Sequence, residues 1–247
     1  MTTIRCLLSV TAVILGLVPL AEEAEPLRWT LDEFRTRCIP LWSDEPTAKG
    51  DDCTVAEFGE IVELDGSTFY YARYHDGRAP DPGWFQTLGE FNVLVILRSD
   101  PPDREAATVF HVRKPGNDYG YLTHFAPELI RTQRGPILYL KALGPGGSDG
   151  QYDNHQYWLW RSGGWVLLDA LSWVYALRER MPNGYSLGGI RNLAPALETM
   201  NYATDAYRAG DSRAEPTGGT VTIYFEWDDL TLQVARFEHD PNPAAKD

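Results

Sequence analysis

Short apolar runs separated by turn residues make up most of the chain after residue 60. Residues 67–74 (STFYYARY) are rich in aromatic and β-branched side chains, which favour strands. Residues 91–97 (FNVLVIL) are almost continuously apolar, a pattern typical of a strand that is buried on both faces. Because turn signals recur at short intervals between such runs, the pattern predicts a β-sandwich or barrel rather than alternating strands and helices.

Residues 108–113 (TVFHVR) have the alternating pattern of a half-buried strand. Strict alternation places Val109 and His111 on one face and Phe110 and Val112 on the other. Since His111 falls in the middle of this strand, we expect it to be a hydrogen-bonded structural residue. No second histidine lies at a short metal-ligand spacing from it.

Three further pairs of strands are predicted, and glycine, proline or aspartate residues lie between the two strands of each pair. These pairs are 129–133 with 137–143, 157–160 with 165–168, and 220–227 with 230–237. Helices are expected at 170–181, which ends at Pro182-Asn183-Gly184, and at 194–202. The predicted fold class is therefore mainly β, an antiparallel β-sandwich or barrel with one or two short helices.

The first 21 residues have the pattern of a secretory signal peptide. Arg5 precedes an apolar run from Leu7 to Ala21, which is short for a membrane span of about 20 apolar residues. An uncleaved anchor or a misassigned start codon is the alternative. We expect cleavage after Ala21 or Ala24 and a secreted or periplasmic protein with no stable membrane anchor after processing.

Three segments follow the signal peptide in the predicted organisation. Residues 22–60 form an irregular arm, in which Thr30 and Glu33 have the spacing of a capping box that starts a short helix. Residues 61–238 form a single β-rich domain, because no glycine- or serine-rich linker divides them. Residues 239–247 form a disordered tail.

Cys38 and Cys53 are the cysteines that remain once Cys6 leaves with the signal peptide. A disulfide between them would close a loop of about 15 residues and stabilise the arm by about 3 kcal/mol in the loop-entropy model. Such a bridge fits an oxidising compartment. Two unpaired thiols are the alternative.

The formal net charge of the chain is −13 at pH 7. Cleavage of the signal peptide would make it more negative, because it removes the positive charge of Arg5. Such a surface repels nucleic-acid phosphates and anionic membranes. The densest basic segment, Arg178–Arg180, holds only two arginines around a glutamate. We therefore expect no nucleic-acid partner.

The segment 144–155 (GPGGSDGQYDNH) concentrates oxygen and nitrogen ligands in a glycine-rich loop. Asp149 and Asp153 make it a candidate calcium site, and calcium is the one cofactor that the sequence suggests, although the spacing departs from an EF-hand. His155 with Asp153 and Asp169 could instead serve as a general acid and base. A solvated loop with Asx-turns is the third interpretation.

Several aromatic residues fall outside the predicted strands, beside glycine or polar residues. They are Trp84, Tyr119, Tyr121 and Tyr152. Exposed rings next to amide and carboxylate groups can hold sugar rings or extended peptides. The alternative is that these rings close the ends of the sandwich core.

The C-terminal third carries a pattern composed of Trp165–Asp169, Trp173, Met181–Gly184 and the turn-rich stretch Gly210–Gly219. This part of the chain resembles secreted, uncharacterised β-rich proteins of Gram-negative bacteria. A pair of adjacent cysteines often precedes the proline in that group, whereas Ala214 and Glu215 stand there in this chain. The resemblance implies the compartment and the β architecture and brings no activity with it.

The sequence favours a non-catalytic binding or interaction module that presents aromatic-bearing loops to a glycan, a peptide or an envelope partner. The His-Glu-x-x-His motif of zinc proteases does not occur in the sequence. The alternative is an extracellular or periplasmic hydrolase that uses Asp153, His155 and Asp169, or a pair of carboxylates, as acid and base.

Overall fold

A computed structural model of the chain describes residues 28–39, 53–76, 93–113, 123–143, 155–190, 193–212 and 214–241. Its helices are α1 (Leu31–Thr36), α2 (Trp173–Arg180) and α3 (Ala194–Thr199). Its strands are β1 (Arg28–Thr30), β2 (Cys53–Leu64), β3 (Ser67–Asp76), β4 (Val93–Ser99), β5 (Ala106–Arg113), β6 (Thr123–His124), β7 (Glu128–Thr132), β8 (Gly135–Leu140), β9 (Ala142–Leu143), β10 (Gln156–Arg161), β11 (Gly164–Leu167), β12 (Tyr185–Leu187), β13 (Asn201–Arg208), β14 (Thr220–Asp228) and β15 (Thr231–Asp240). The predicted mainly β, antiparallel fold class is confirmed.

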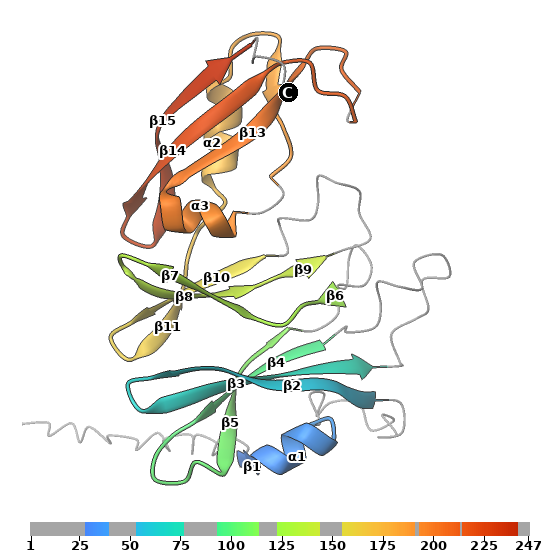
Figure 1. The fold of residues 1–247 in the computed structure, drawn as a ribbon, viewed down its shortest axis with the longest axis vertical. Coiled ribbons are helices and arrows are strands. Elements are labelled where there is room, and N and C mark those ends of the chain that lie inside the picture. The colour runs from blue at the N-terminus through green and yellow to red at the C-terminus, as the bar shows by residue number, and fades with distance from the viewer. Residues whose placement is uncertain are drawn as a thin grey trace, which may run out of the picture.

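Three sheets are stacked along the long axis of the molecule (Figure 1). The N-terminal sheet has the strand order β1-β5-β4-β3-β2, the central sheet β11-β10-β8-β7, and the C-terminal sheet β12-β13-β14-β15. A short pair, β6 with β9, lies beside the central sheet. Helix α1 lies below the N-terminal sheet, and α2 and α3 lie at the C-terminal sheet. The chain thus forms a sandwich with a further helix-and-sheet layer above it.

Strand β4 is buried on both faces, as its continuous apolar pattern predicts. Leu94 and Ile96 belong to a core that the N-terminal sheet shares with the central sheet. Val93 and Val95 point the other way and share a second core with Phe34 of α1. The alternation of side chains along one strand therefore ties α1 and the central sheet to opposite faces of the same sheet.

The largest core lies between the central sheet and the C-terminal layer. Tyr139 and Tyr157 come from the central sheet, Leu177 from α2, Leu197 from α3 and Ile223 from β14, and each is almost fully buried. At roughly 25 cal/mol per Å² of apolar surface removed from water, this core is a main source of stability for the upper half of the molecule.

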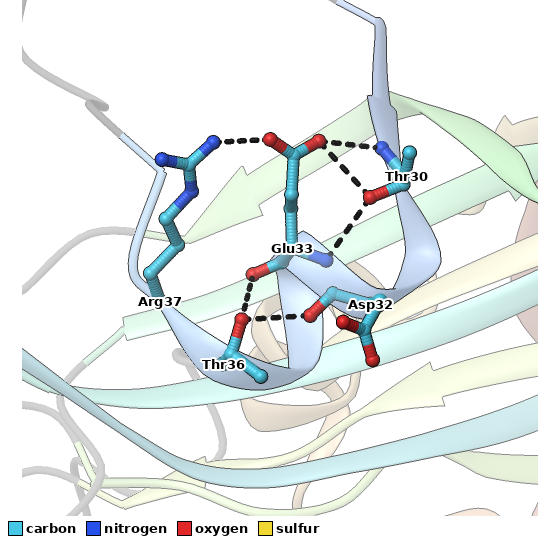
Figure 2. Close-up of polar contacts among 5 residues, drawn as sticks. All are labelled: Thr30, Asp32, Glu33, Thr36 and Arg37. Atoms are coloured by element: carbon cyan, nitrogen blue, oxygen red, sulfur yellow. Dashed lines mark hydrogen bonds and ion pairs between the residues drawn. The ribbon is translucent and has the colours of Figure 1, made fainter.

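Helix α1 begins at the capping box that the sequence predicts (Figure 2). The backbone N–H of Glu33 donates to Thr30 Oγ1 at 3.2 Å, and Glu33 Oε2 accepts from the backbone N–H of Thr30 at 2.9 Å. Arg37 pairs with the other carboxylate oxygen of Glu33. Arg37 follows the last residue of the helix, and the next residue, Cys38, forms the predicted disulfide with Cys53 at the start of β2.

The predicted hairpins form because the residues of their turns adopt the backbone conformation that a tight turn requires. In the β10–β11 hairpin, Ser162 and Gly163 both have positive φ, at 54° and 80°, which suits a type I′ turn. A hairpin that we did not predict joins β2 to β3 in the same way, with Asp65 at 49° and Gly66 at 85°.

Several predicted boundaries differ from the structure. Strand β2 begins at Cys53, inside the arm that we expected to be irregular through residue 60, because it pairs with β3 along its length. Strand β15 runs to Asp240 into the predicted tail, since it pairs with β14 to that point. Helix α3 ends at Thr199 rather than at residue 202, because Met200 adopts a left-handed conformation with φ 56°.

The prediction for the two faces of β5 was wrong in one respect. The register between β4 and β5 shifts, so that Ile96 pairs with His111 and Leu97 pairs with Val109. Phe110 is the extra residue of this β-bulge, and a bulge changes the side on which the following residues lie. As a result Val109 and Val112 share the core next to α1.

Similar irregularities occur on the outer strands of two sheets. In β2, Ala56 and Ile61 each lack a partner in the pairing with β3. In β15, Ala235 is the extra residue opposite β14. Both strands lie at sheet edges, where bulges are common.

Candidate functional site

Most of the residues that the sequence singles out lie outside the described residues. These are Trp84, Tyr119, Tyr121, Tyr152, Asp149 and Asp153. The aromatic binding loops and the calcium site therefore stay predictions, as does the signal peptide of residues 1–21. His155 and Asp169, the two other members of the proposed acid–base set, are described.

His155 lies directly before β10 and is buried, with 6% of its surface exposed. Its Nδ1 atom is 3.0 Å from the hydroxyl of Tyr139 on β8. Tyr139 pairs with Tyr157 across the two strands, and their rings stack with centroids 4.8 Å apart. The pairing of β8 with β10 thus assembles three polar rings, His155, Tyr139 and Tyr157, which we call the histidine–tyrosine cluster.

The histidine–tyrosine cluster is electrically neutral at pH 7. Burial, together with the nearby cations Lys141 and Arg113, lowers the pKa of His155 to about 4. Burial also raises the pKa of Tyr139 to about 12 and raises that of Tyr157. None of the three rings therefore changes its protonation near pH 7, and the described contacts of the cluster are the hydrogen bond between His155 and Tyr139 and the stacking of the two tyrosine rings.

Two atoms of the cluster have no hydrogen-bond partner among the described residues. These are Nε2 of His155 and the hydroxyl oxygen of Tyr157, and both are buried. Groups of this kind usually bond to an ordered water molecule when they are buried in a folded protein.

Asp169 has a structural task at the start of α2. Its Oδ1 atom accepts from the backbone N–H of Ser172 at 3.0 Å and from that of Leu171 at 3.3 Å. Burial opposes ionisation of this carboxyl, but the hydrogen bonds from Ser172 and Leu171 outweigh it, so its pKa lies below the usual range. In the described part of the chain, no hydrogen bond or ion pair joins Asp169 to His155.

Sequence reasoning missed the buried cation of this region. Arg113 ends β5, is 9% exposed, and donates from Nη1 to the backbone oxygen of Leu140 at 3.0 Å. Burial lowers its pKa to about 10. His111 lies close by and is hydrogen-bonded, as predicted, with Nε2 3.1 Å from Gln156 Oε1. An arginine at the end of a strand usually reaches solvent, so the pattern of β5 carries no signal of this burial.

One open cavity, of about 530 Å³, lies at the turn between β4 and β5. Arg28, Arg98, Asp100 and Asp103 line it together with Pro101 and Pro102. The charges are paired, because Arg28 contacts Asp103 at 3.3 Å and Arg98 contacts Asp100 at 2.8 Å. This cavity therefore presents little net charge to a ligand.

A second open cavity, of about 450 Å³, lies at the β12 edge of the C-terminal sheet. We call it the β12 cavity. It is lined by Arg178, Ser186, Leu187, Gly188, Gly189, Tyr207, Arg208, Ala209, Gly210 and Asp211. The residues come from α2, from β12 and the glycines after it, and from the end of β13. The basic segment Arg178–Arg180 and the turn signal at Gly210 hint at parts of it, but no local pattern brings them together.

No group of three metal-ligating side chains occurs within the described ranges, and no helix there is long and apolar enough to cross a membrane. No protein-family model, curated protein or solved structure matches the chain, so inferences about its function rest on its own residues.

Proposed function

We propose that this chain is a non-catalytic binding module that works in the extracellular space or the periplasm and holds a saccharide ligand. The observation that carries the proposal is the β12 cavity, whose volume of about 450 Å³ falls in the range of small-molecule sites. Its lining residues include two arginines, a serine and a tyrosine, and residues of these types recognise sugars in other binding sites.

Two features support the proposed compartment. The first 21 residues have the pattern of a signal peptide. The Cys38–Cys53 disulfide fits an oxidising compartment.

The hydrolase alternative has less support. A general acid or base works best with a pKa near the operating pH, and the pKa of His155 lies at about 4. The carboxylate of Asp169 is held by backbone N–H groups of Leu171 and Ser172. Asp153, the third member of that set, lies outside the described residues.

A thermal-shift screen tests the proposal. The purified protein is heated with neutral oligosaccharides, acidic oligosaccharides and cell-wall fragments, each with and without Ca²⁺. A ligand at a hundredfold excess over its Kd stabilises the folded state by about 2.7 kcal/mol, which is a clear shift of the midpoint. A shift with one saccharide class, with no product after prolonged incubation, supports a binding module. Product formation that His155→Gln abolishes would support the hydrolase, and no shift with any saccharide refutes the proposed function.

The sequence-predicted aromatic loops are tested in the same screen. Trp84→Ala and Tyr119→Ala are expected to weaken a saccharide ligand if these rings contact it. Unchanged shifts in both variants would remove the two rings from the binding surface and leave the β12 cavity as the site to examine.

A further inference from the structure

The turn 182–185 connects α2 to the edge strand β12 and contains the only Asn-Gly pair of the sequence. The backbone N–H of Tyr185 donates to the carbonyl of Pro182 at 3.0 Å, which closes the turn. Gly184 has a φ of 83°, whereas Asn183 is not one of the described residues with positive φ. These features define a type II turn, in which Asn183 and Gly184 are the two central residues.

An asparagine that precedes a glycine can lose its side-chain amide through attack by the backbone, and asparagine is among the thermolabile residues of proteins. The backbone nitrogen of the glycine gives up its proton and forms a bond to the side-chain Cγ, and the amide nitrogen leaves as ammonia. The resulting succinimide ring takes up a water molecule and opens at either carbonyl, which gives aspartate or isoaspartate. Glycine favours this step because no side chain obstructs the approach of its nitrogen.

The two residues that would react are accessible. Asn183 and Gly184 are both exposed. Among the described residues, neither the side-chain amide of Asn183 nor the backbone N–H of Gly184 has a hydrogen-bond partner. A Cβ added to Gly184 would have nothing within 4 Å, so the space beside this residue is open.

The attack requires rotation of the peptide that joins Asn183 to Gly184. Type I and type II turns share the hydrogen bond that closes the turn, and ψ of the first central residue is about +120° in type II and about −30° in type I. Glycine adopts negative φ as readily as positive φ, so this exchange is open to Gly184. In one sense of the rotation, the nitrogen of Gly184 passes beside the side chain of Asn183. The bond between Tyr185 and Pro182 can therefore persist while the reacting atoms meet.

Asn201, the other asparagine among the described residues, is exposed but lacks these features. Its side-chain amide nitrogen donates to the carbonyl of Thr199 at 3.1 Å. The residue after it, Tyr202, carries a bulky side chain and pairs with Ile223 between β13 and β14. Rotation of the peptide after Asn201 would disturb this pairing, so Asn201 is a matched internal control.

We infer that Asn183-Gly184 is a site of spontaneous deamidation in the folded protein, and that its isoaspartate product loosens the β12 edge of the C-terminal sheet. The inference goes beyond the proposed binding function and does not depend on it.

The effect on β12 follows from the path of the main chain. In isoaspartate the main chain runs through the former side chain, which adds one carbon between α2 and β12. The backbone N–H of Ala209 donates to the carbonyl of Gly184 at 2.9 Å and joins this turn to the end of β13. Strand β12 has only three residues, so a change of spacing at Gly184 affects a large part of its pairing.

Peptide mapping by mass spectrometry tests the inference on the purified, folded protein during incubation at neutral and at mildly alkaline pH. The peptide that contains Asn183 is expected to be lost with time to its aspartate and isoaspartate forms. The loss should be faster at the higher pH, because the attacking nitrogen must give up its proton. Asn201 is expected to stay unmodified over the same period. Equal conversion of the two asparagines, or conversion of Asn183 only after unfolding in urea, would overturn the inference.

Two variants separate the effect of the added carbon from that of the added charge. Asn183→Gln keeps an amide on a longer side chain, which would have to close a larger ring, and is expected to stay unmodified. Freshly purified Asn183→Asp carries the new negative charge on an unchanged main chain, and it is expected to melt with the fresh wild type because residue 183 is exposed. The isoaspartate fraction of the aged wild type should melt at a lower temperature than either variant. A midpoint equal to that of Asn183→Asp would contradict the loosening of β12.

Discussion

Acidification should destabilise the protein through His155. The folded protein holds this imidazole at a pKa of about 4, against an ordinary value of 6.5. The unfolded chain therefore binds the proton more tightly than the folded chain. The contribution of the neutral His155 to the free energy of unfolding is present above pH 6.5 and decreases as the pH drops below that value. Below about pH 4 this residue causes no further loss of stability.

The size of the effect follows from the two pKa values. Between pH 7 and pH 5, a shift from 6.5 to about 4 removes about 2 kcal/mol from the free energy of unfolding. The cause is burial, together with the positive charges of Lys141 and Arg113 near the ring. His111 adds a loss of the same sign, because burial also lowers its pKa.

Urea denaturation followed by tryptophan fluorescence measures the effect at pH 7, 6 and 5. His155→Gln removes the titrating group while keeping a polar side chain beside Tyr139, so the variant should lose about 2 kcal/mol less than the wild type over this range. Separately, the imidazole resonances of His155 should show no titration above pH 5 by NMR. A variant with the full wild-type pH dependence, or a wild-type imidazole that titrates near pH 6.5, would refute this account of the histidine–tyrosine cluster.

Three further changes test the architecture by urea denaturation. Replacing both bridged cysteines by serine should lower the free energy of unfolding by about 3 kcal/mol, because the bridge closes a loop of 15 residues; no change would mean that the arm is unimportant for stability. Thr30→Ala should cost about 1 kcal/mol through loss of the capping box, and a neutral result would show that α1 is held by packing alone. Gly219→Ala should cost at least about 1 kcal/mol more than Gly66→Ala, since both residues have positive φ but only Gly219 would bring a Cβ against a backbone oxygen, that of Asp240 at 1.9 Å. Equal losses would contradict the close approach at Gly219.

Local signals in the sequence predict the hairpins and α1 well. The β10–β11 hairpin depends on Ser162-Gly163, and α1 depends on Thr30 and Glu33, and in each case the residues lie within a few positions of one another. The stacking of three sheets could not be predicted, because it depends on contacts between distant segments. One such contact is the hydrogen bond from Trp160 Nε1 to Asp65 Oδ2 at 2.9 Å, which joins strand β10 of the central sheet to the β2–β3 turn of the N-terminal sheet.

The candidate site was less predictable than the fold. His155 stands in a polar, glycine-rich segment, which suggests exposure and titration near pH 7, whereas pairing of β8 with β10 buries it against Tyr139. The β12 cavity brings Arg178 and Arg208 together from a helix and a strand that have no sequence pattern in common. Only a three-dimensional arrangement reveals either environment, because burial and charge are set by neighbours from other elements.

The bulges of β2 affect how the edge of the N-terminal sheet can pair with a strand of another molecule. A regular outer strand exposes backbone N–H and C=O groups on which a strand of another molecule can assemble, and this is a common start of aggregation. In β2, Ala56 and Ile61 interrupt that spacing, and the exposed Glu60 adds repulsion between identical copies. We therefore expect this edge to resist association with a second copy of the chain.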